Sequence, residues 1–346
     1  MSIKKFNKLI ASLTVITALI VSGCGTTQVS QPSKASQTGQ SSQSAPVNQP
    51  QKLNFAYTFM PGIGDLPSLI ALDNLKAQGW TVNKTTFSSA PLGIQALTSG
   101  QADIATASVM GAMQAIQQGS PIKIIAEAKR NDWFLVAPTS FTDPAQLDKK
   151  KVAIFGYSTT TDFMVKWTDQ KYNINPQILI MPESTVREQA LIKGQIDATP
   201  LDMSTVQDIQ AKEPGKFHVL VDYAKQFPQL HATVIVASTD FIQNHADVVQ
   251  GYLKALLAAA KDANANPAGV SARVGQYLQN IDPKMADNMV KGYVASNVWP
   301  SNGAVDEESA KYTTSTLGQY GIVKPKDGFT YQNYYDFAPL QKAVGK

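Results

Sequence analysis

A nine-residue block that occurs twice constrains the fold of this 346-residue chain more than any other feature. Gln95-Ala-Leu-Thr-Ser-Gly-Gln-Ala-Asp103 and Gln189-Ala-Leu-Ile-Lys-Gly-Gln-Ile-Asp197 are identical at six positions. Each copy is typical of a helix that ends at a glycine and is followed by a short buried strand. Two copies with similar flanking patterns favour two similar α/β lobes over a solenoid. The alternative is a chance recurrence of a common helix–glycine–strand pattern.

The N-terminus has the composition of an export signal. Lys4, Lys5 and Lys8 precede an uncharged run from position 9 to position 21, which is short for a membrane-spanning helix but typical of a signal-peptide core. We therefore predict a signal peptide over residues 1–23. Without these residues the formal net charge falls from +4 to +1, because three lysines and no acids are removed. No basic block with interleaved aromatic residues remains, so we expect no nucleic-acid partner.

Cys24 is the only cysteine of the chain and follows Val21-Ser-Gly23. A lone thiol at the end of an apolar run is poorly explained as half of a disulfide or as core packing. The pattern resembles the lipobox of bacterial lipoproteins, which implies that Cys24 carries lipid and anchors the protein on the extracytoplasmic face of the cell membrane. The alternative is an ordinary secretory signal with an incidental cysteine. Residues 24–51 are rich in Ser, Gln, Thr and Pro and are predicted to form a disordered linker.

The globular part divides into three segments. We predict a first lobe over residues 52–137, a second lobe over residues 138–237, and a helical segment over residues 238–346 that returns to the first lobe. The β-rich runs at 133–138 and 233–237 are expected to carry the chain out of the first lobe and back. Two lobes joined by two crossing strands imply a cleft between them and closure about a hinge.

A series of short segments stands in a characteristic order along this body. The segments are the strand–loop–helix start at Phe55, Leu97-Thr-Ser-Gly-Gln-Ala-Asp-Ile104, Leu147-Asp-Lys-Lys-Lys-Val-Ala-Ile154, the Ser/Thr loop at 157–161, and Gly194-Gln-Ile-Asp-Ala198. With the lipobox and the linker, they resemble the substrate-binding proteins of ABC importers for nitrate, taurine, alkanesulfonates and thiamine precursors. The resemblance runs from about Leu53 to Tyr335.

This resemblance implies a type II periplasmic-binding fold. It also implies that a monomer traps a small solute in the cleft and delivers it to a membrane permease and its ATPase. Such families often carry Trp-Glu-Pro after the second Asp-Ala strand, whereas this chain has Asp202-Met-Ser204. That departure argues against the familiar ligands, taurine above all.

A run of hydroxyl residues is the strongest candidate for the binding site. Tyr157, Ser158, Thr159 and Thr160 follow a predicted strand and Gly156, and they open a predicted helix. Consecutive hydroxyls and free backbone N–H groups at a helix N-terminus form a concavity that binds anions without a cation. A sulfonate, carboxylate or nitrate would fit there. The alternative is simple helix capping, for which one such residue is enough.

The facing wall is expected at two strand-to-helix junctions of the first lobe. Ser89 and Ser108 stand at these junctions. Phe59, Met60 and Met110 are predicted to contact an apolar part of the ligand, with ordinary core packing as the alternative.

Four further residues are candidates for the site. Arg130 could clamp an anion and Trp133 could stack on a ring, although a surface arginine and a core tryptophan explain them as well. Asp202 could accept a hydrogen bond from an ammonium or a ring N–H of the ligand, or it could cap the helix that begins near Ser204. His231 is a candidate cleft residue near the return crossing.

The sequence offers little for catalysis. The three histidines lack the spacing of a metal site, and neither Gly-x-Ser-x-Gly nor a phosphate-binding loop occurs. We therefore predict a solute receptor for a small organic anion, such as an organosulfonate, with no enzymatic activity, cofactor or metal. The alternatives are a heteroaromatic ligand such as a pyrimidine, thiamine precursor or flavin precursor, an enzyme on the same fold, and a sensor ectodomain.

Overall fold

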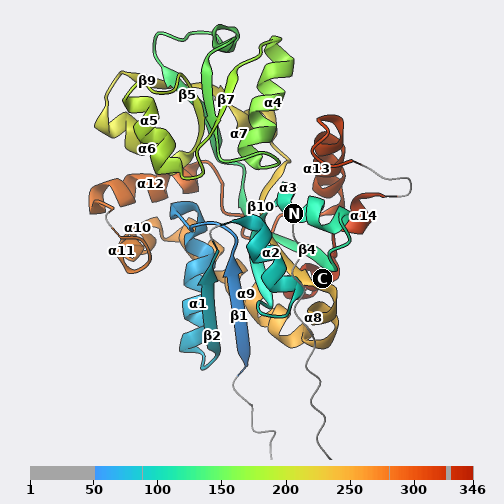
Figure 1. Ribbon diagram of the computed structural model, residues 1–346. Coiled ribbons are helices and arrows are strands. Elements are labelled where there is room, and N and C mark those ends of the chain that lie inside the picture. The colour runs from blue at the N-terminus through green and yellow to red at the C-terminus, as the bar shows by residue number, and fades with distance from the viewer. Residues whose placement is uncertain (1–50, 88, 280, 325–328, 346) are drawn as a thin grey trace, which may run out of the picture. The chain divides into compact units, whose positions relative to one another are not determined.

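The computed structural model describes residues 51–87, 89–279, 281–324 and 329–345 (Figure 1). The predicted signal peptide, Cys24 and all of the predicted linker except Gln51 lie outside the described residues. Among the helices that are described, none combines the length and the apolar character that crossing a membrane requires.

The first lobe is built on a five-stranded sheet in the order β2-β1-β3-β10-β4. Its strands are β1 (Lys52–Tyr57), β2 (Thr81–Thr86), β3 (Ile104–Ser108), β4 (Ile122–Arg130) and β10 (His231–Ser238). β1 pairs in parallel with β2 and β3, whereas β10 runs antiparallel to both β3 and β4. It follows that β1, β3 and β4 all end at the same edge of this sheet.

Helices connect the parallel strands of this lobe, as the alternating β and α patterns predict. They are η1 (Ile63–Asp65), α1 (Leu66–Ala77), α2 (Ala90–Thr98) and α3 (Val109–Gln117). α1 packs against α9 (Ala246–Ala265), which belongs to the C-terminal segment. The other helices of that segment are α8 (Thr239–Asn244), α10 (Pro267–Ser271), α11 (Val274–Tyr277), α12 (Pro283–Ala295), α13 (Glu307–Gln319), α14 (Tyr331–Tyr334) and α15 (Ala338–Ala343).

The second lobe has a three-stranded sheet, β8-β5-β9, and a two-stranded sheet, β6-β7. Its strands are β5 (Trp133–Pro138), β6 (Lys151–Ile154), β7 (Gln177–Ile180), β8 (Thr199–Asp202) and β9 (Phe217–Asp222). A parallel bridge between Val152 and Ala198 joins β6 to β8, so β6 lies between β7 and β8.

The helices of this lobe are η2 (Pro144–Leu147), α4 (Thr160–Tyr172), α5 (Ser184–Ile192), α6 (Met203–Lys212) and α7 (Tyr223–Gln226). In Figure 1 the lobe is the green and yellow part, with α4 on one side of its strands and α5 and α6 on the other.

Strand pairing differs from the predicted lobe boundaries at two places. β5, which we predicted to end the first lobe, pairs with β8 and β9. β10, which we predicted to end the second lobe, completes the first sheet between β3 and β4. The chain therefore passes between the lobes at residues 131–132 and 227–230, before each strand begins. The backbone N–H and C=O groups of β5 and β10 pair with strands of the lobe that each strand enters.

Both copies of the repeated block adopt the predicted helix–glycine–strand structure. α2 and α5 each end two residues before a glycine with positive φ, +72° at Gly100 and +65° at Gly194. The last aspartate of each copy accepts a hydrogen bond from the backbone of a strand of its own lobe, β1 or β6. The pairs are Asn54 N to Asp103 Oδ2 at 2.6 Å and Lys151 N to Asp197 Oδ2 at 2.8 Å. This shared role argues against a chance recurrence and confirms an α/β chain with two similarly built lobes.

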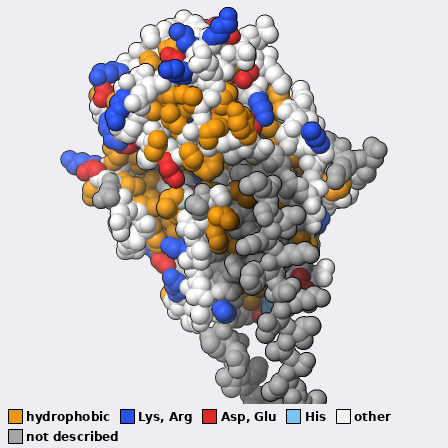
Figure 2. Space-filling view, viewed as in Figure 1, with side chains coloured by type: hydrophobic (Ala, Val, Ile, Leu, Met, Phe, Trp, Pro, Cys, Tyr) orange, Lys and Arg blue, Asp and Glu red, His pale blue; other side chains and the backbone are white. Residues whose placement is uncertain are grey.

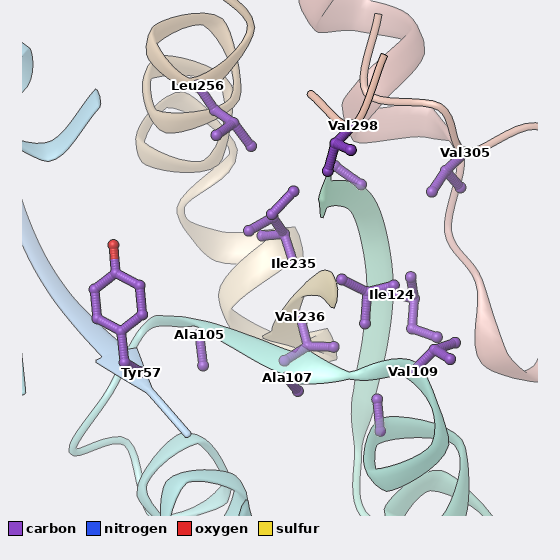
Figure 3. Close-up of a cluster of buried hydrophobic side chains, with 14 of the residues drawn as sticks. Tyr57, Ala105, Ala107, Val109, Ile124, Ile235, Val236, Leu256, Val298 and Val305 are labelled. Carbon is purple, nitrogen blue, oxygen red and sulfur yellow. The ribbon is translucent and has the colours of Figure 1, made fainter. Parts of the chain in front are cut away.

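The core of the first lobe lies on both faces of its central strands. Figure 3 shows Ala105 of β3, Ile124 of β4 and Ile235 of β10 among its side chains, and all three are fully buried. Leu256 of α9 packs in the same cluster. Small alanines on β3 leave room for the branched side chains of β4 and β10, which fixes the relative positions of the strand ends that carry the site.

Candidate functional site

The ends of the strands place the predicted site residues at two facing edges. In the first lobe, β1, β3 and β4 end at Tyr57, Ser108 and Arg130 on one edge. In the second lobe, β6 and β8 are parallel, and Trp133 at the start of β5 pairs with Asp202 at the end of β8. Only residues 131–132 separate β4 from β5, so the two edges meet at the crossing. Ligands of open α/β sheets bind at such carboxyl edges.

Three loops of the first lobe come together at its edge. Ser108 caps α3, and its Oγ accepts a hydrogen bond from the N–H of Gly111 at 3.1 Å. A Cβ on Gly93 of α2 would lie 2.5 Å from Thr58 Cγ2, so the first turn of α2, which follows Ser89, packs closely on the loop after β1. The edge therefore presents short polar side chains from three strand ends.

The three predicted apolar contacts of this edge differ in exposure. Phe59 is half-buried and Met60 is exposed, so both are available to a ligand. Met110 has no exposed surface and packs in the core, which is the alternative stated for it above.

The Ser/Thr loop of the second lobe uses part of its hydrogen-bonding capacity on itself. Thr159 caps α4, and its Oγ1 donates to Gly156 O at 2.7 Å. Thr161 Oγ1 accepts from the N–H of Phe155 and bonds to Thr159 Oγ1. Ser158 has a left-handed backbone, with φ +64°, and its N–H donates to a carboxylate of the loop, Asp162 Oδ2, at 2.8 Å.

The groups that remain are those a ligand could use. Among the described residues, no hydrogen bond involves the hydroxyls of Ser158 and Thr160 or the backbone N–H groups of Thr160 and Thr161. Tyr157 is exposed beside them. The loop is thus both a helix cap and a set of free donors, and the two interpretations offered by the sequence are compatible.

Arg130 lies in a hollow that is separate from the Ser/Thr loop. It lines this hollow, which has a volume of about 190 Å³, together with Glu127, His231, residues of the loops 228–230 and 302–306, and the first turn of α13. No residue of the Ser/Thr loop lines this hollow. Burial raises the pKa of the Glu127 carboxyl to about 8 and lowers the pKa of the His231 imidazole to about 4. His231 is fully engaged, because its ring nitrogens bond to Tyr335 Oη at 2.9 Å and to Ala304 O at 3.1 Å.

A buried charged cluster at the crossing was not predicted from the sequence. Lys129 of β4 is 8% exposed, and its Nζ lies 3.2 Å from Asp132 Oδ2. Tyr293 of α12 donates from its hydroxyl to the same oxygen at 2.9 Å. The negative charges of Asp65 and Asp202 also raise the pKa of Lys129. We refer to Lys129, Asp65, Asp132, Asp202 and Tyr293 as the crossing cluster.

A glycine makes room for this cluster. A Cβ on Gly64 would lie 2.5 Å from Lys129 Cδ and 3.0 Å from Tyr293 Cε1, so the lysine stem passes directly over the glycine. The carbonyl of Gly64 accepts from Trp299 Nε1 at 2.8 Å, which holds the loop in place. Gly64 therefore allows Lys129 and Tyr293 to pack directly on this loop.

The pKa values of the three carboxyl groups in the cluster shift in different directions. Burial raises the pKa of both Asp65 and Asp132, and the charge of Lys129 offsets this only in part. Burial also acts on Asp202, but Lys129 and hydrogen bonds from α6 outweigh it and hold the pKa of that carboxyl below its ordinary value. The three carboxylates outweigh the desolvation of Lys129 and raise its pKa. The charge of Lys129 is thus balanced by carboxylates of the protein itself.

Asp202 combines both roles that the sequence left open. Its Oδ1 accepts from Thr205 N at 3.1 Å and its Oδ2 from Thr205 Oγ1 at 2.9 Å, so it caps α6. At the same time it faces Lys129 from the other lobe. The sequence holds only a weak signal for the cluster, since Lys129 is one of four charged residues among the nine of β4. Among the described residues, no group of three His, Cys, Asp or Glu side chains could hold a metal ion.

Solved structures of similar fold cover most of the chain. The ligand-binding component of an ABC-type import system from Staphylococcus aureus, with zinc bound, is 15% identical, with a TM-score of 0.70 over 85% of this chain and 99% of that one. The alkanesulfonate-binding protein SsuA from Xanthomonas axonopodis pv. citri, bound to MOPS, is 15% identical, with a TM-score of 0.65 over 83% and 99%. A Candida albicans gene product with the generic periplasmic binding protein fold is 15% identical, with a TM-score of 0.60 over 86% and 95%.

These likenesses show that the chain has the periplasmic binding protein fold, as the resemblance implied. No curated protein sequence matches the chain well enough to count as a relative. The family model described as NMT1/THI5 like matches residues 82–270, which is more than half of the chain. The match includes the repeated block, the crossing cluster residues Lys129, Asp132 and Asp202, and the Ser/Thr loop. The chain belongs to the NMT1/THI5-like family.

Proposed function

We propose that this protein is the extracytoplasmic solute-binding component of an ABC importer and captures a small solute between its lobes. The proposal rests on one observation. The sheet edges at which the strands end carry polar loops in both lobes, and these two edges meet where the chain crosses between the lobes. Such crossings permit closure about a hinge, and a ligand that contacts both edges stabilises the closed state by its extra affinity for it. The Staphylococcus structure of similar fold is itself the ligand-binding component of an import system.

We propose a small organic anion as the solute. The free hydroxyls of Ser158 and Thr160 and the free N–H groups at the start of α4 are donors without a competing acceptor among the described residues. Charge-assisted hydrogen bonds to such donors are short and strong. The Xanthomonas protein of similar fold binds alkanesulfonates, which supports a sulfonate as the first compound to test.

A second candidate is a heteroaromatic solute with N–H groups. Among the described residues, Asp65 Oδ1, Asp132 Oδ1 and Thr58 Oγ1 are buried without a hydrogen-bond partner. Buried acceptors of this kind are costly unless a donor satisfies them. A ring N–H or an exocyclic amine would do so, and half-buried Phe59 and Trp133 could stack on the ring.

A thermal-shift screen separates the two candidates. We expect an alkanesulfonate to raise the melting temperature by several degrees, because a ligand at a hundred times its Kd stabilises a protein by about 2.7 kcal/mol. Nitrate, carboxylates, pyrimidines and flavins complete the panel. A shift with pyrimidines or flavins alone would reject the anion and support the second candidate.

Two variants test the loop itself. Thr160→Val keeps the shape of the side chain, and Ser158→Gly suits the positive φ, so each removes a hydroxyl at little cost to the fold. We expect each to weaken alkanesulfonate binding by about tenfold, the effect of one hydrogen bond to a charged group. Thr98→Val, on an exposed helix end of the first lobe, is the control. Unchanged affinity in both variants would remove the loop from the site.

Delivery to a permease is supported by the distribution of exposed hydrophobic side chains. All the large ones among the described residues, apart from Val344, lie at or next to the carboxyl edges of the two lobes. They are Met60, Leu92, Tyr157, Ile180 and Val186. Figure 2 shows hydrophobic side chains gathered on a face of the second lobe. Apolar patches of this kind mark interaction sites.

We expect Leu92→Ser and Val186→Ser together to reduce uptake of the solute by cells without changing its binding to the purified protein. Val344→Ser is the matched control, because it changes an exposed hydrophobic residue away from the edges. Uptake at the wild-type rate would argue against this docking face.

The membrane anchor is proposed from the sequence alone. If Cys24 carries lipid, Cys24→Ala should release the protein into the soluble fraction of cells, while Ser22→Ala should leave it on the membrane. Retention of the Cys24 variant on membranes would reject the anchor. We further propose that the protein acts as a monomer and has no enzymatic activity.

A further inference from the structure

Arg187 in α5 is fully buried, which is unusual for an arginine. Its guanidinium reaches back from the first turns of the helix to the loop after β7. Nη1 donates to Met181 O at 2.8 Å and to Pro182 O at 3.0 Å, and Nη2 donates to Ser184 Oγ at 2.9 Å. Nη2 also lies 3.4 Å from Pro200 O, in β8. All of these acceptors are neutral.

The positive charge of Arg187 has no direct partner. No carboxylate among the described residues lies within 4 Å of the guanidinium, and Nε is buried without a hydrogen-bond acceptor. Burial lowers the pKa of Arg187 to about 10, although Asp202 and Glu183 oppose this through their charge. Asp202 is itself engaged by Lys129 and by the N-terminus of α6, and Glu183 lies outside ion-pair distance. A buried charge left in this state is costly to the fold.

The sheet order places this charge near the end of β6, where Met181 N bonds to Ile154 O. β6 lies between β7 and β8, and the guanidinium contacts both the loop after β7 and Pro200 in β8. It therefore lies next to the end of β6, from which the chain continues into residues 157–160. The guanidinium itself is buried, so its field passes through protein before it reaches the exposed residues Tyr157 and Ser158 of the loop.

We propose that Arg187 determines the preference of the second lobe for anionic solutes, acting through its field rather than by direct contact. This inference rests on the proposed function and adds to it the source of the positive potential. The free hydroxyls and N–H groups of the loop contact the ligand, whereas Arg187 selects for its charge. A purely structural arginine would need only its hydrogen bonds to Met181, Pro182 and Ser184, and would not discriminate between charged and neutral ligands of one shape.

A matched pair of ligands tests this inference. Butane-1-sulfonate and butane-1-sulfonamide have nearly the same shape, but only the first is charged at pH 7. Titration calorimetry would give the affinity of wild-type protein, Arg187→Gln and Arg187→Lys for each. We expect Arg187→Gln to weaken sulfonate binding by about tenfold to thirtyfold, which is the effect of one unit charge over a separation of about 8 to 12 Å at an effective dielectric of about 20. We expect Arg187→Lys to retain most of the binding. Sulfonamide binding should change by less than about twofold.

The outcomes separate this inference from the proposed function. If wild-type protein binds no sulfonate, the proposed anion and the role of Arg187 both fail. If wild-type protein and Arg187→Gln bind sulfonate equally well, or if both ligands weaken together, only the role of Arg187 is overturned. If Arg187→Gln does not fold, an NMR titration of wild-type protein replaces the variant, with the Nε–H resonance of Arg187 as the signal. Sulfonate should shift it more than sulfonamide does, and equal shifts would contradict the inference.

Discussion

Replacing Glu127 with Gln should remove much of a loss of stability that we expect as the pH rises from about 4.5 to about 8. Glu127 is 3% exposed in β4. Burial raises the pKa of its carboxyl from 4.5 to about 8, and the N–H of Ala232 and the charge of Arg130 offset this only partly. The folded protein therefore holds a proton that the unfolded chain releases. Its contribution to stability is complete below pH 4.5 and is lost as the pH rises through about 8. The difference between the two pKa values corresponds to about 5 kcal/mol.

Urea unfolding followed by tryptophan fluorescence, at a series of pH values between about 5 and 9, measures this loss. Glu127→Gln keeps an oxygen that can accept from Ala232 N, which Glu127 Oε1 does at 3.0 Å. We expect the wild-type free energy of unfolding to fall by several kcal/mol more than that of the variant. Glu308→Gln, at an exposed acid of the same hollow, is the control and should follow wild type. Parallel curves for wild type and Glu127→Gln would refute the reasoning.

Three further changes test the packing and the charges at the crossing. Gly64→Ala should destabilise the protein by about 1–3 kcal/mol, because its Cβ would meet Lys129, whereas Gly62→Ala meets nothing within 4 Å and should be neutral; thermal unfolding compares them. Tyr293→Phe removes a donor to a buried carboxylate and should cost about 1–3 kcal/mol in urea unfolding. His231→Gln should flatten the loss of stability between about pH 6.5 and 4, where the unfolded chain takes up a proton that the buried imidazole resists.

The elements set by local pattern were predictable from the sequence. Gly100 and Gly194 end their helices as expected, because a left-handed residue after a helix is a local requirement that glycine meets at least cost. Ser108, Thr159 and Asp202 are helix caps. Capping was the alternative stated for the Ser/Thr loop and for Asp202, and Ser108 was placed at a strand-to-helix junction. Capping is decided within four residues, so the sequence alone contains the information.

The features set by distant packing were not predictable. β10 could not be assigned to the first sheet, since its partners β3 and β4 lie more than a hundred residues earlier. Lys129 joins the crossing cluster only because Gly64 leaves space for its stem. Arg187 occupies a helical position that is typical of a solvated charge, and its burial depends on the loop after β7 folding over it. In each case the decisive neighbour comes from another part of the chain.

The placement of β10 has a consequence for how the protein comes to be folded. All strand partners of the second lobe lie within one continuous stretch, from β5 to β9. The first sheet, in contrast, lacks its fourth strand until residue 238 has left the ribosome. Pairings of such long sequence separation form slowly, because the loop must close before any contact rewards it. The half of the molecule that begins first is therefore the half that is completed last.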